Sequence, residues 1–191
     1  MALLAGDGLL NSAFEILSDV TEFKTLSDGE LLAIIRCLSA ASGVYGMIGG
    51  QVVDLQCEER DNVTSDELIY LHNHKTGALI RAAVRCGCLC GGVNQNEETE
   101  EILDSYAQSL GLAFQIKDDI LDVTGDEKLL GKPIGSDAEE GKNTFVTMFD
   151  LDGAKRYLSE TTGEAKEILK PLGEKGKFLD SLADYLLSRK Y

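Results

Sequence analysis

Proline and strand-like alternation are both scarce in this chain of 191 residues. The only prolines are Pro133 and Pro171, so the residue that most strongly disrupts helices is nearly absent. Few stretches alternate apolar and polar side chains as a half-buried strand does. We therefore predict an all-α fold, and the length suits a single domain over residues 1–191.

Basic residues are also in short supply. The chain has 18 lysines and arginines against 33 aspartates and glutamates, which gives a formal net charge of −15. Nucleic acids are bound through dense patches of lysine and arginine, so this balance argues against a nucleic-acid partner. An anionic substrate is awkward for the same reason, and a phosphate ligand would need metal ions and a few well-placed lysines.

Long apolar runs and a secretory signal are not evident. No apolar run approaches the ~18 residues of a membrane span, so we expect no span. The segment Met1 to Asp7 lacks the basic start and the long apolar stretch of a signal peptide. The cysteines are odd in number and lie in helix-like runs, at Cys37, Cys57, Cys86, Cys88 and Cys90. Reduced thiols in a cytoplasmic protein are the simplest interpretation.

Two capping boxes indicate where long helices begin. In Ser27–Glu30 and in Thr64–Glu67, a hydroxyl and a carboxylate three residues apart can bond each other's free backbone N–H groups. The first box predicts a helix that runs to about residue 55, and the second predicts a helix over residues 68–89. Further helices are expected over residues 2–19, 97–123, 144–149, 151–169 and 175–191, and an irregular stretch over residues 124–143.

Four glycines interrupt the helix that follows Ser27, at Gly43, Gly46, Gly49 and Gly50. Each glycine inside a helix costs roughly 1 kcal/mol relative to alanine, so the cluster needs a physical reason. Either a neighbouring helix approaches closely at these positions, or the helix bends or opens to admit a ligand. The sequence leaves both explanations open.

The segment from Phe114 to Asp122 carries the strongest chemical signal. On a helix, Asp118 and Asp122 share a face, Asp119 lies beside them, and Gln115 lies one turn earlier. These carboxylates repel each other unless a cation is present, and Mg²⁺ takes oxygen ligands that usually include a phosphate. A solvated acidic face is the alternative, but carboxylates set in an apolar helix usually have a partner.

Two lysines could hold a phosphate. Lys132 lies in a Gly-Lys-Pro turn ten residues after Asp122 and is available as a point charge. Lys75 is followed by Thr76 and Gly77, and lysine with threonine can bind phosphate oxygens where glycine lets the backbone be approached. An ordinary surface lysine is the alternative for Lys75.

The histidines and the cysteine cluster do not suggest a metal. His72 and His74 are two residues apart and would point in roughly opposite directions on a helix. The cysteines of Cys86–Cys90 also diverge, and no second pair follows at zinc-site spacing. We predict that these cysteines are small buried thiols.

Together these motifs resemble the C-terminal part of the trans-polyprenyl diphosphate synthases, of the farnesyl or geranylgeranyl diphosphate synthase kind. The resemblance covers essentially the whole chain in family order, and the segment Phe114 to Asp122 is its most specific part. The other matching segments are Ala5 to Leu10, Gly49–Gln51, Lys75–Gly77, Gly131–Pro133 and Gly141 to Thr144.

The resemblance implies an isoprenoid-synthase helical bundle around a deep cavity, and usually a homodimer. In such enzymes two aspartate-rich motifs hold three Mg²⁺ ions, which bind the diphosphate of an allylic substrate. Ionisation releases pyrophosphate and leaves an allylic cation. Isopentenyl diphosphate then attacks this cation head to tail, and a proton is lost.

The resemblance also assigns metal roles to the aspartates. Asp118 would bind Mg²⁺ directly, and Asp119 and Asp122 would bind the ion through water or orient it. Lys75 and Lys132 would hold the allylic diphosphate.

Three neighbouring side chains would act on the allylic cation. Thr76 and Gln115 would stabilise it or assist proton removal. Phe114 would line the site and turn its ring face towards the developing positive charge.

The sequence departs from the family pattern in its N-terminal part. The first aspartate-rich motif and the basic residues that bind isopentenyl diphosphate are not present. We therefore expect an N-terminally truncated bundle, with Met1 at the middle of the family pattern, that is not a competent synthase alone. Apolar surface exposed by the missing helices would favour association of the chain with itself or with a partner.

Two other functions fit parts of the sequence. A terpene cyclase shares the fold and metal chemistry, but its usual second metal motif, with asparagine and serine or threonine ligands, is not found here. A non-catalytic subunit of a prenyl synthase would suit the missing half. Such subunits commonly lose their aspartates, and this chain retains Asp118, Asp119 and Asp122.

Overall fold

The computed structural model describes residues 1–58, 60, 62–93, 96–125 and 142–189. Every regular element in these ranges is helical, in agreement with the predicted all-α fold. The elements are α1 (Ala2–Ser18), α2 (Asp28–Ser42), α3 (Met47–Glu58), α4 (Ser65–His72), the π-helical turn η1 (Asn73–Gly77), α5 (Ala78–Cys90), α6 (Glu97–Thr124), α9 (Phe145–Leu169), the 3₁₀ segment η3 (Lys170–Gly176) and α10 (Lys177–Ser188).

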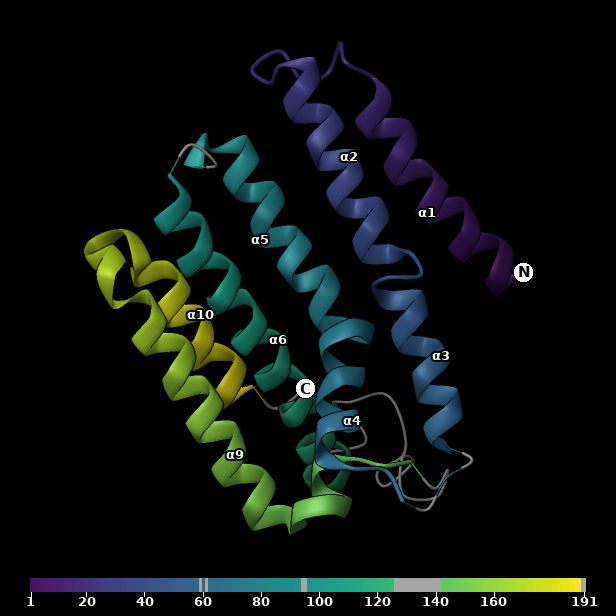
Figure 1. The fold of residues 1–191 in the computed structure, drawn as a ribbon, viewed down its shortest axis with the longest axis vertical. Helices are drawn as coiled ribbons and strands as arrows, with labels where there is room; N and C mark the ends of the chain where they lie inside the picture. Colours follow the sequence, from purple (N-terminus) through teal and green to yellow (C-terminus); the bar gives the residue numbers. More distant parts are fainter. Residues whose placement is uncertain (59, 61, 94–95, 126–141, 190–191) are drawn as a thin grey trace.

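The helices pack side by side across the molecule in the order α1, α2, α5, α6, α9 (Figure 1). Helix α10 packs against α9 and α6, and helix α3 packs against η1. In Figure 1 the purple and blue helices α1 to α3 lie on one side and the green and yellow helices α9 and α10 on the other. Helix α6, which carries the aspartate segment, therefore lies inside the assembly.

The buried apolar core lies between α6 and the helices that follow it. One cluster joins the second half of α6 to the first half of α9 and to α4, and consists of Leu68, Ala113, Ile116, Ile120, Phe145, Ala154 and Leu158. A second cluster joins the first half of α6 to α9 and α10, and consists of Tyr106, Leu110, Ala165, Leu169 and Ala183. The aspartate segment therefore stands on a rigid, packed helix.

Both predicted capping boxes are present. The Glu30 carboxylate accepts a hydrogen bond from the Ser27 backbone N–H at 2.8 Å, and Ser27 Oγ accepts one from the Glu30 N–H at 3.3 Å. At the start of α4, the Glu67 carboxylate and Thr64 make the same two bonds at 2.9 and 3.3 Å. These bonds satisfy backbone donors that would otherwise be free at each helix start.

Three predicted helix boundaries need correction. The helix that follows Ser27 ends at Ser42, because the chain leaves helical geometry at Gly43 (ψ −163°), and α3 begins only at Met47. The next predicted helix contains a π-helical turn, η1, between α4 and α5. The two segments predicted over residues 144–169 form one helix, α9, interrupted at Asp150 (φ 58°), whose carboxylate accepts a hydrogen bond from the Gly153 N–H at 2.8 Å.

One helical stretch in the described part of the chain, Asp28–Glu58, has the length and apolar composition of a possible membrane span. The stretch includes the break at Gly43 described above, and it does not contradict the expectation that the chain has no span. A single stretch of this kind is weak evidence for a span, because the core helix of a soluble protein passes the same test.

Candidate functional site

Lys75 lies on the π-helical turn η1, which packs directly against α3. A Cβ atom on Gly50 would lie 2.3 Å from the backbone nitrogen of Lys75 and 2.6 Å from its Cα, so only glycine allows this approach. On the other side, a Cβ on Gly111 of α6 would lie 3.0 Å from the Cα of Gly77. Close packing therefore explains Gly50, and the helix break explains Gly43. Single π-turns inserted in α-helices are frequent at functional sites.

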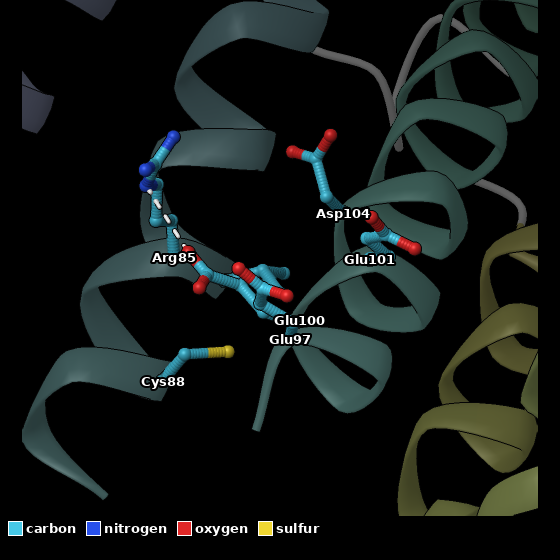
Figure 2. A pocket seen from close by; sticks show the side chains of 7 residues that line it. Arg85, Cys88, Glu97, Glu100, Glu101 and Asp104 are labelled. Carbon is cyan, nitrogen blue, oxygen red and sulfur yellow. Dashed lines mark ion pairs between the residues drawn. The ribbon is translucent and has the colours of Figure 1, made fainter. Parts of the chain in front are cut away.

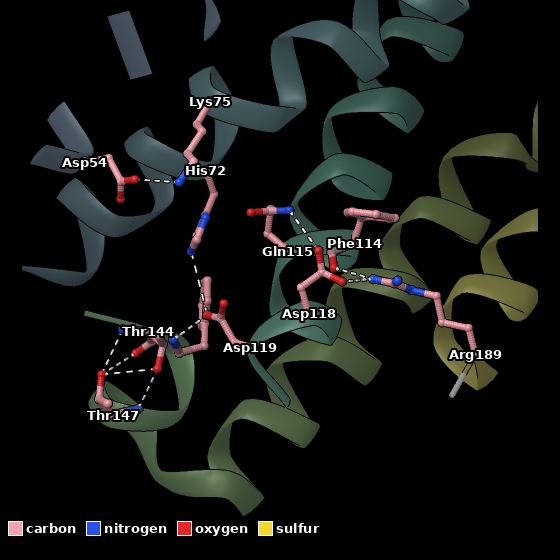
Figure 3. Close-up of polar contacts among 11 residues, drawn as sticks. Asp54, His72, Lys75, Phe114, Gln115, Asp118, Asp119, Thr144, Thr147 and Arg189 are labelled. Carbon is pink, nitrogen blue, oxygen red and sulfur yellow. Dashed lines mark hydrogen bonds and ion pairs between the residues drawn. The ribbon is translucent and has the colours of Figure 1, made fainter. Parts of the chain in front are cut away.

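The ammonium group of Lys75 already has an anionic partner. Its Nζ donates a hydrogen bond of 2.5 Å to Asp54 Oδ2 on α3, and both side chains are partly buried. Thr76 follows on the same turn and is also partly buried. This pair brings the charge of Lys75 to the side of η1 that faces α3 (Figure 3).

Asp118 is the exposed carboxylate of the aspartate segment. Its side chain is 43% exposed, and the Gln115 side chain, one turn earlier, donates a hydrogen bond of 3.4 Å to Asp118 Oδ2. The guanidinium of Arg189, just beyond α10, forms an ion pair with Asp118 Oδ1 (Figure 3). Arg189 also lies over the Phe114 ring, with its Cζ 4.1 Å from the ring centroid.

Asp119 points away from Asp118, into the protein. Its Oδ2 accepts a hydrogen bond of 2.8 Å from the backbone N–H of Phe145, the first residue of α9. A carboxylate at a helix N-terminus satisfies a free donor and is stabilised by the helix dipole. Asp119 therefore fixes the start of α9 against α6. Asp122 is fully buried.

His72 is the buried neighbour of Asp119. Its Nε2 lies 3.8 Å from Asp119 Oδ2, and its ring stacks on Phe145 with centroids 5.6 Å apart. Burial, together with the charge of Lys75, lowers the pKa of His72 to about 4, so the ring is neutral at pH 7. His74 points elsewhere and stacks on Tyr70, as its spacing from His72 predicts.

The two residues before α9, Asn143 and Thr144, make hydrogen bonds near His72 and Asp119. Thr144 caps α9, because its Oγ1 accepts a hydrogen bond of 3.1 Å from the Thr147 N–H. The Asn143 side chain donates a hydrogen bond of 3.2 Å to the carbonyl oxygen of Cys57, near the end of α3. Asn143 and Thr144, which belong to the matching segment, thus contact α3 and α9. Lys132 lies outside the described residues.

The surroundings of Asp118 fit a hard cation. The Asp118 carboxylate already binds a positively charged group, the Arg189 guanidinium, which stands in for a cation at this position. Within the described ranges, no three histidine, cysteine, aspartate or glutamate side chains lie close enough together to hold a metal. A Mg²⁺ ion at Asp118 would therefore need oxygen ligands from a phosphate, as is usual for this ion.

A separate hollow of about 350 Å³ lies between α5 and the first turns of α6 (Figure 2). It is lined by Val84, Arg85, Cys88, Glu97, Glu100, Glu101 and Asp104. Asp104 precedes Asp118 by 14 residues on α6, or roughly 21 Å of helix, so this hollow is distinct from the aspartate site. Burial raises the pKa of the Cys88 thiol, which makes it a poor nucleophile.

The cysteines of Cys86–Cys90 only partly match the prediction of buried thiols. Cys88 is buried, Cys86 is partly buried, and Cys90 is exposed. Residues two apart on a helix face different directions, so one helix face cannot bury all three.

The family model described as polyprenyl synthetase matches residues 1–177. The chain belongs to the polyprenyl synthetase family. It is 44% identical to the farnesyl diphosphate synthase of Escherichia coli (strain K12), over 98% of this chain and 63% of that protein. It is 41% identical to a dimethylallyltranstransferase of Fischerella ambigua, over all of this chain and 54% of that protein.

Solved structures of such synthases share the fold. A geranyltransferase from Helicobacter pylori, complexed with magnesium and isoprenyl diphosphate, matches 97% of this chain with a TM-score of 0.83 and 34% identity. A farnesyl-diphosphate synthase homologue from Marinomonas matches 98% with a TM-score of 0.79. The chain covers 59% and 62% of these proteins, and 63% and 54% of the two curated relatives. The comparisons favour prenyl synthases over terpene cyclases.

Within this polyprenyl synthetase chain, sequence reasoning missed three residues of the site. Asp54 is an acid on an apolar helix, which is a weak signal for a partner. His72 has no local signal for its contact with Asp119, since the two lie 47 residues apart in the sequence. Arg189 comes to Asp118 only through the packing of α10 on α6 and α9.

Proposed function

We propose that this chain provides the part of a prenyltransferase active site that binds Mg²⁺ through Asp118 and the diphosphate through lysines. The proposed reaction is the head-to-tail condensation of an allylic diphosphate with isopentenyl diphosphate. The observation that carries the proposal is the turn Phe114 to Asp118, where an exposed carboxylate and an aromatic face already contact a cationic group, and the Gln115 amide bonds to that carboxylate. The magnesium- and isoprenyl-diphosphate-bound geranyltransferase that shares this fold supports it.

In this proposal Asp118 is the direct metal ligand, and Lys75 binds the diphosphate. Bound Mg²⁺ would neutralise the negative charge that develops on the leaving diphosphate. Lys75 supplies a further positive charge from η1, once a diphosphate competes with Asp54 for its ammonium group. Lys132 is proposed as a second diphosphate ligand.

Asp119 and Asp122 act by orienting the site. Asp119 holds α9 against α6 through the Phe145 N–H, and this hydrogen bond fixes the helix turn that presents Asp118. Asp122 is buried one turn further along α6. Both carboxylates would then shape the site through structure or through water, as the family pattern implies.

Phe114, Gln115 and Thr76 are proposed to act on the allylic cation. The Phe114 ring already has a cation over its face, which indicates that its position favours positive charge. The Gln115 amide lies beside Asp118 and presents a carbonyl oxygen as well as its donor. Either Thr76 or Gln115 could assist proton removal at the end of the reaction.

The complete reaction needs a second aspartate-rich motif, which binds the Mg²⁺ ions together with this one. Asp118-Asp119 is the only Asp-Asp pair in these 191 residues. We therefore expect the chain alone to bind Mg²⁺ only in the millimolar range and to lack normal turnover. A non-catalytic subunit is the second candidate, and the retained Asp118 argues against it.

Two further properties support a cytoplasmic, self-associating enzyme. All five cysteines are free, which suits a reducing compartment. Large apolar side chains are exposed on α1 and α3, including Leu9 and Val52, and such surfaces often mark protein interfaces. We propose a homo-oligomer that covers this surface.

The test is calorimetric titration of pyrophosphate into the chain with and without Mg²⁺. We expect Asp118→Asn to weaken magnesium-dependent binding roughly tenfold or more, since loss of groups that bind or orient a metal has effects of that size. Lys75→Gln should weaken pyrophosphate binding with or without the metal. The matched control is Asp104→Asn, an exposed aspartate on the same helix, paired with Arg81. Equal binding by the Asp118 and Asp104 variants would overturn the proposal.

A further inference from the structure

Arg189 is the least exposed cation of the interhelical arginine–aspartate pairs described. Its side chain is 10% exposed, although its partner Asp118 is 43% exposed. The comparable pair between α5 and α6, Arg81 with Asp104, is 44% and 40% exposed. Burying a guanidinium costs free energy unless its charge and its donors are paired. We therefore infer that the groups around Arg189 hold it at this position.

The contacts of the Arg189 guanidinium with described residues include Asp118 and Phe114. Its Nη2 donates to Asp118 Oδ1, forming the ion pair described above, and donates a hydrogen bond of 3.2 Å to the carbonyl oxygen of Phe114. The face of the Phe114 ring lies 4.1 Å from its Cζ. A carboxylate and an aromatic face are the two groups that the proposed function assigns to cations, Mg²⁺ at Asp118 and the allylic cation at Phe114.

Mg²⁺ and this guanidinium cannot share Asp118 at low cost. Two cations on one carboxylate repel each other, and the repulsion is large where water is partly excluded. Arg189 lies beyond Ser188, the last residue of α10, so its side chain can move away from Asp118 while the helix stays intact. Rotation of its side chain frees Asp118 without unwinding the helix.

We propose that Arg189 is an internal cation that occupies the Asp118–Phe114 position in the metal-free protein and withdraws when Mg²⁺ and a diphosphate bind. This inference rests on the proposed function of Asp118 as a metal ligand. Arg189 keeps the Asp118 carboxylate neutralised and oriented until the metal arrives. It also lowers the apparent affinity for the metal, because only molecules in which Arg189 has left Asp118 can bind the ion.

The first test compares Arg189→Gln with the unaltered chain by titration of pyrophosphate in the presence of Mg²⁺. Loss of a positive charge from this acidic protein should weaken anion binding in general. We expect the opposite, a gain in magnesium-dependent affinity of about three- to tenfold, the net size of one typical hydrogen bond. Arg189→Lys, which keeps the charge but loses the planar fork, should fall between the two.

The matched control is Arg81→Gln, which removes the same charge from an arginine–aspartate pair on α5 and α6. It should leave binding unchanged or slightly weaker. Thermal unfolding of each variant without metal checks that the chain is folded. Unchanged or weaker binding by Arg189→Gln would overturn the proposal, and weaker binding would instead make Arg189 a diphosphate ligand.

The second test follows release of the side chain directly. A protease specific for arginine must bind the guanidinium, so cleavage after Arg189 should be slow in the metal-free protein. Adding Mg²⁺ with pyrophosphate should accelerate that cleavage severalfold, as read by mass spectrometry. Cleavage after Arg60, paired with Glu67 away from the site, serves as the internal control.

The two proposals fail in different ways. If Asp118→Asn binds magnesium and pyrophosphate normally, the metal site itself is wrong. Suppose instead that Asp118→Asn loses binding, that Arg189→Gln binds pyrophosphate with unchanged affinity, and that Mg²⁺ with pyrophosphate leaves the cleavage rate after Arg189 unchanged. The metal site then stands, and only the role of Arg189 is overturned.

Discussion

The N-terminal region, α1 to α3, and the C-terminal region, α4 to α10, are both helical but are built differently. Helix α1 buries no residue, whereas α6 buries ten and α9 eight. Both core clusters lie entirely in the C-terminal region. Most of the large apolar side chains that are exposed lie in the N-terminal region, including Leu3, Leu4, Leu9, Ile16, Leu32, Val44, Ile48, Val52 and Leu55.

This difference shows that an amphipathic pattern does not reveal what covers it. Helix α1 is at least as rich in apolar residues as α10, but only α10 packs against the core. The candidate site lies on the packed region and contacts the other region through two hydrogen bonds to α3, from Lys75 to Asp54 and from Asn143 to the carbonyl oxygen of Cys57. The C-terminal region should therefore determine the stability of the chain, and the contact with α3 should determine the geometry of the lysine.

The largest expected effect is the loss of stability on truncating Phe145, a core residue of the C-terminal region. Phe145 is fully buried and its ring contacts His72, Phe149 and Tyr157. Truncation to alanine should lower the free energy of unfolding by about 3–5 kcal/mol, because a cavity remains where the ring was. The measurement is urea-induced unfolding followed by circular dichroism.

The paired variant is Ile16→Ala on α1. Ile16 is 60% exposed, so its truncation should change the free energy of unfolding by no more than about 0.5 kcal/mol. A loss from Ile16→Ala as large as that from Phe145→Ala would show that α1 is covered in solution. Measuring both variants over a range of protein concentrations would then reveal whether a second copy supplies the cover.

The second-largest effect concerns the packing of α3 on η1, one of the places where the two regions meet. Gly50→Ala puts a methyl group 2.3 Å from the backbone of Lys75, so α3 and η1 must separate. We expect a loss of about 1–3 kcal/mol, the usual cost of overpacking, together with weaker binding of pyrophosphate by the displaced lysine. Urea unfolding and calorimetric titration measure the two effects.

Gly87→Ala is the control for the same substitution in a helix. A Cβ at Gly87 meets nothing within 4 Å, so alanine should stabilise α5 by up to about 1 kcal/mol through helix propensity. If Gly50→Ala were also stabilising, the close approach of α3 to η1 would not exist in solution.

Local signals in the sequence were sufficient for most of the fold. The capping boxes at Ser27 and Thr64 predicted two helix starts correctly, since both partners of each box lie within four residues. The aspartate helix was predicted over residues 97–123 and is observed as Glu97–Thr124. The scarcity of proline was a sound basis for the all-α prediction.

Features that depend on distant partners could not be read from the sequence. The glycines around Gly50 suggested either close packing or a bend, and only the position of Lys75, 25 residues later, decides for close packing there. Helical periodicity placed Asp118, Asp119 and Asp122 together. In the structure Asp119 faces α9 and Asp122 is buried, because neighbouring helices select which side chains of one turn remain exposed.

The smallest expected effect concerns Glu67, which helps to join the two regions across the α3–α4 connection. Arg60, with the Thr64 backbone and side chain, lowers the pKa of Glu67 to about 2, whereas Glu30 of α2 has its pKa lowered by Ser27 alone. A carboxyl whose folded pKa lies below its unfolded value of 4.5 stabilises the protein above that value. This stabilisation is lost as the pH falls from about 4.5 towards 2.

Glutamine can still complete a capping box, so Glu67→Gln removes the charge and the ion pair with Arg60 but keeps the cap. Its urea midpoint should lie below that of the unaltered chain at pH 7, and the gap should narrow as the pH falls below 4.5. Glu30→Gln should show the same trend with a smaller gap, because Glu30 has no arginine partner among its pKa-lowering contacts. A larger gap for Glu30→Gln would mean that the ion pair between Arg60 and Glu67 contributes little to the free energy of unfolding. The two regions would then be joined mainly by the packing of α2 on α5 and of α3 on η1.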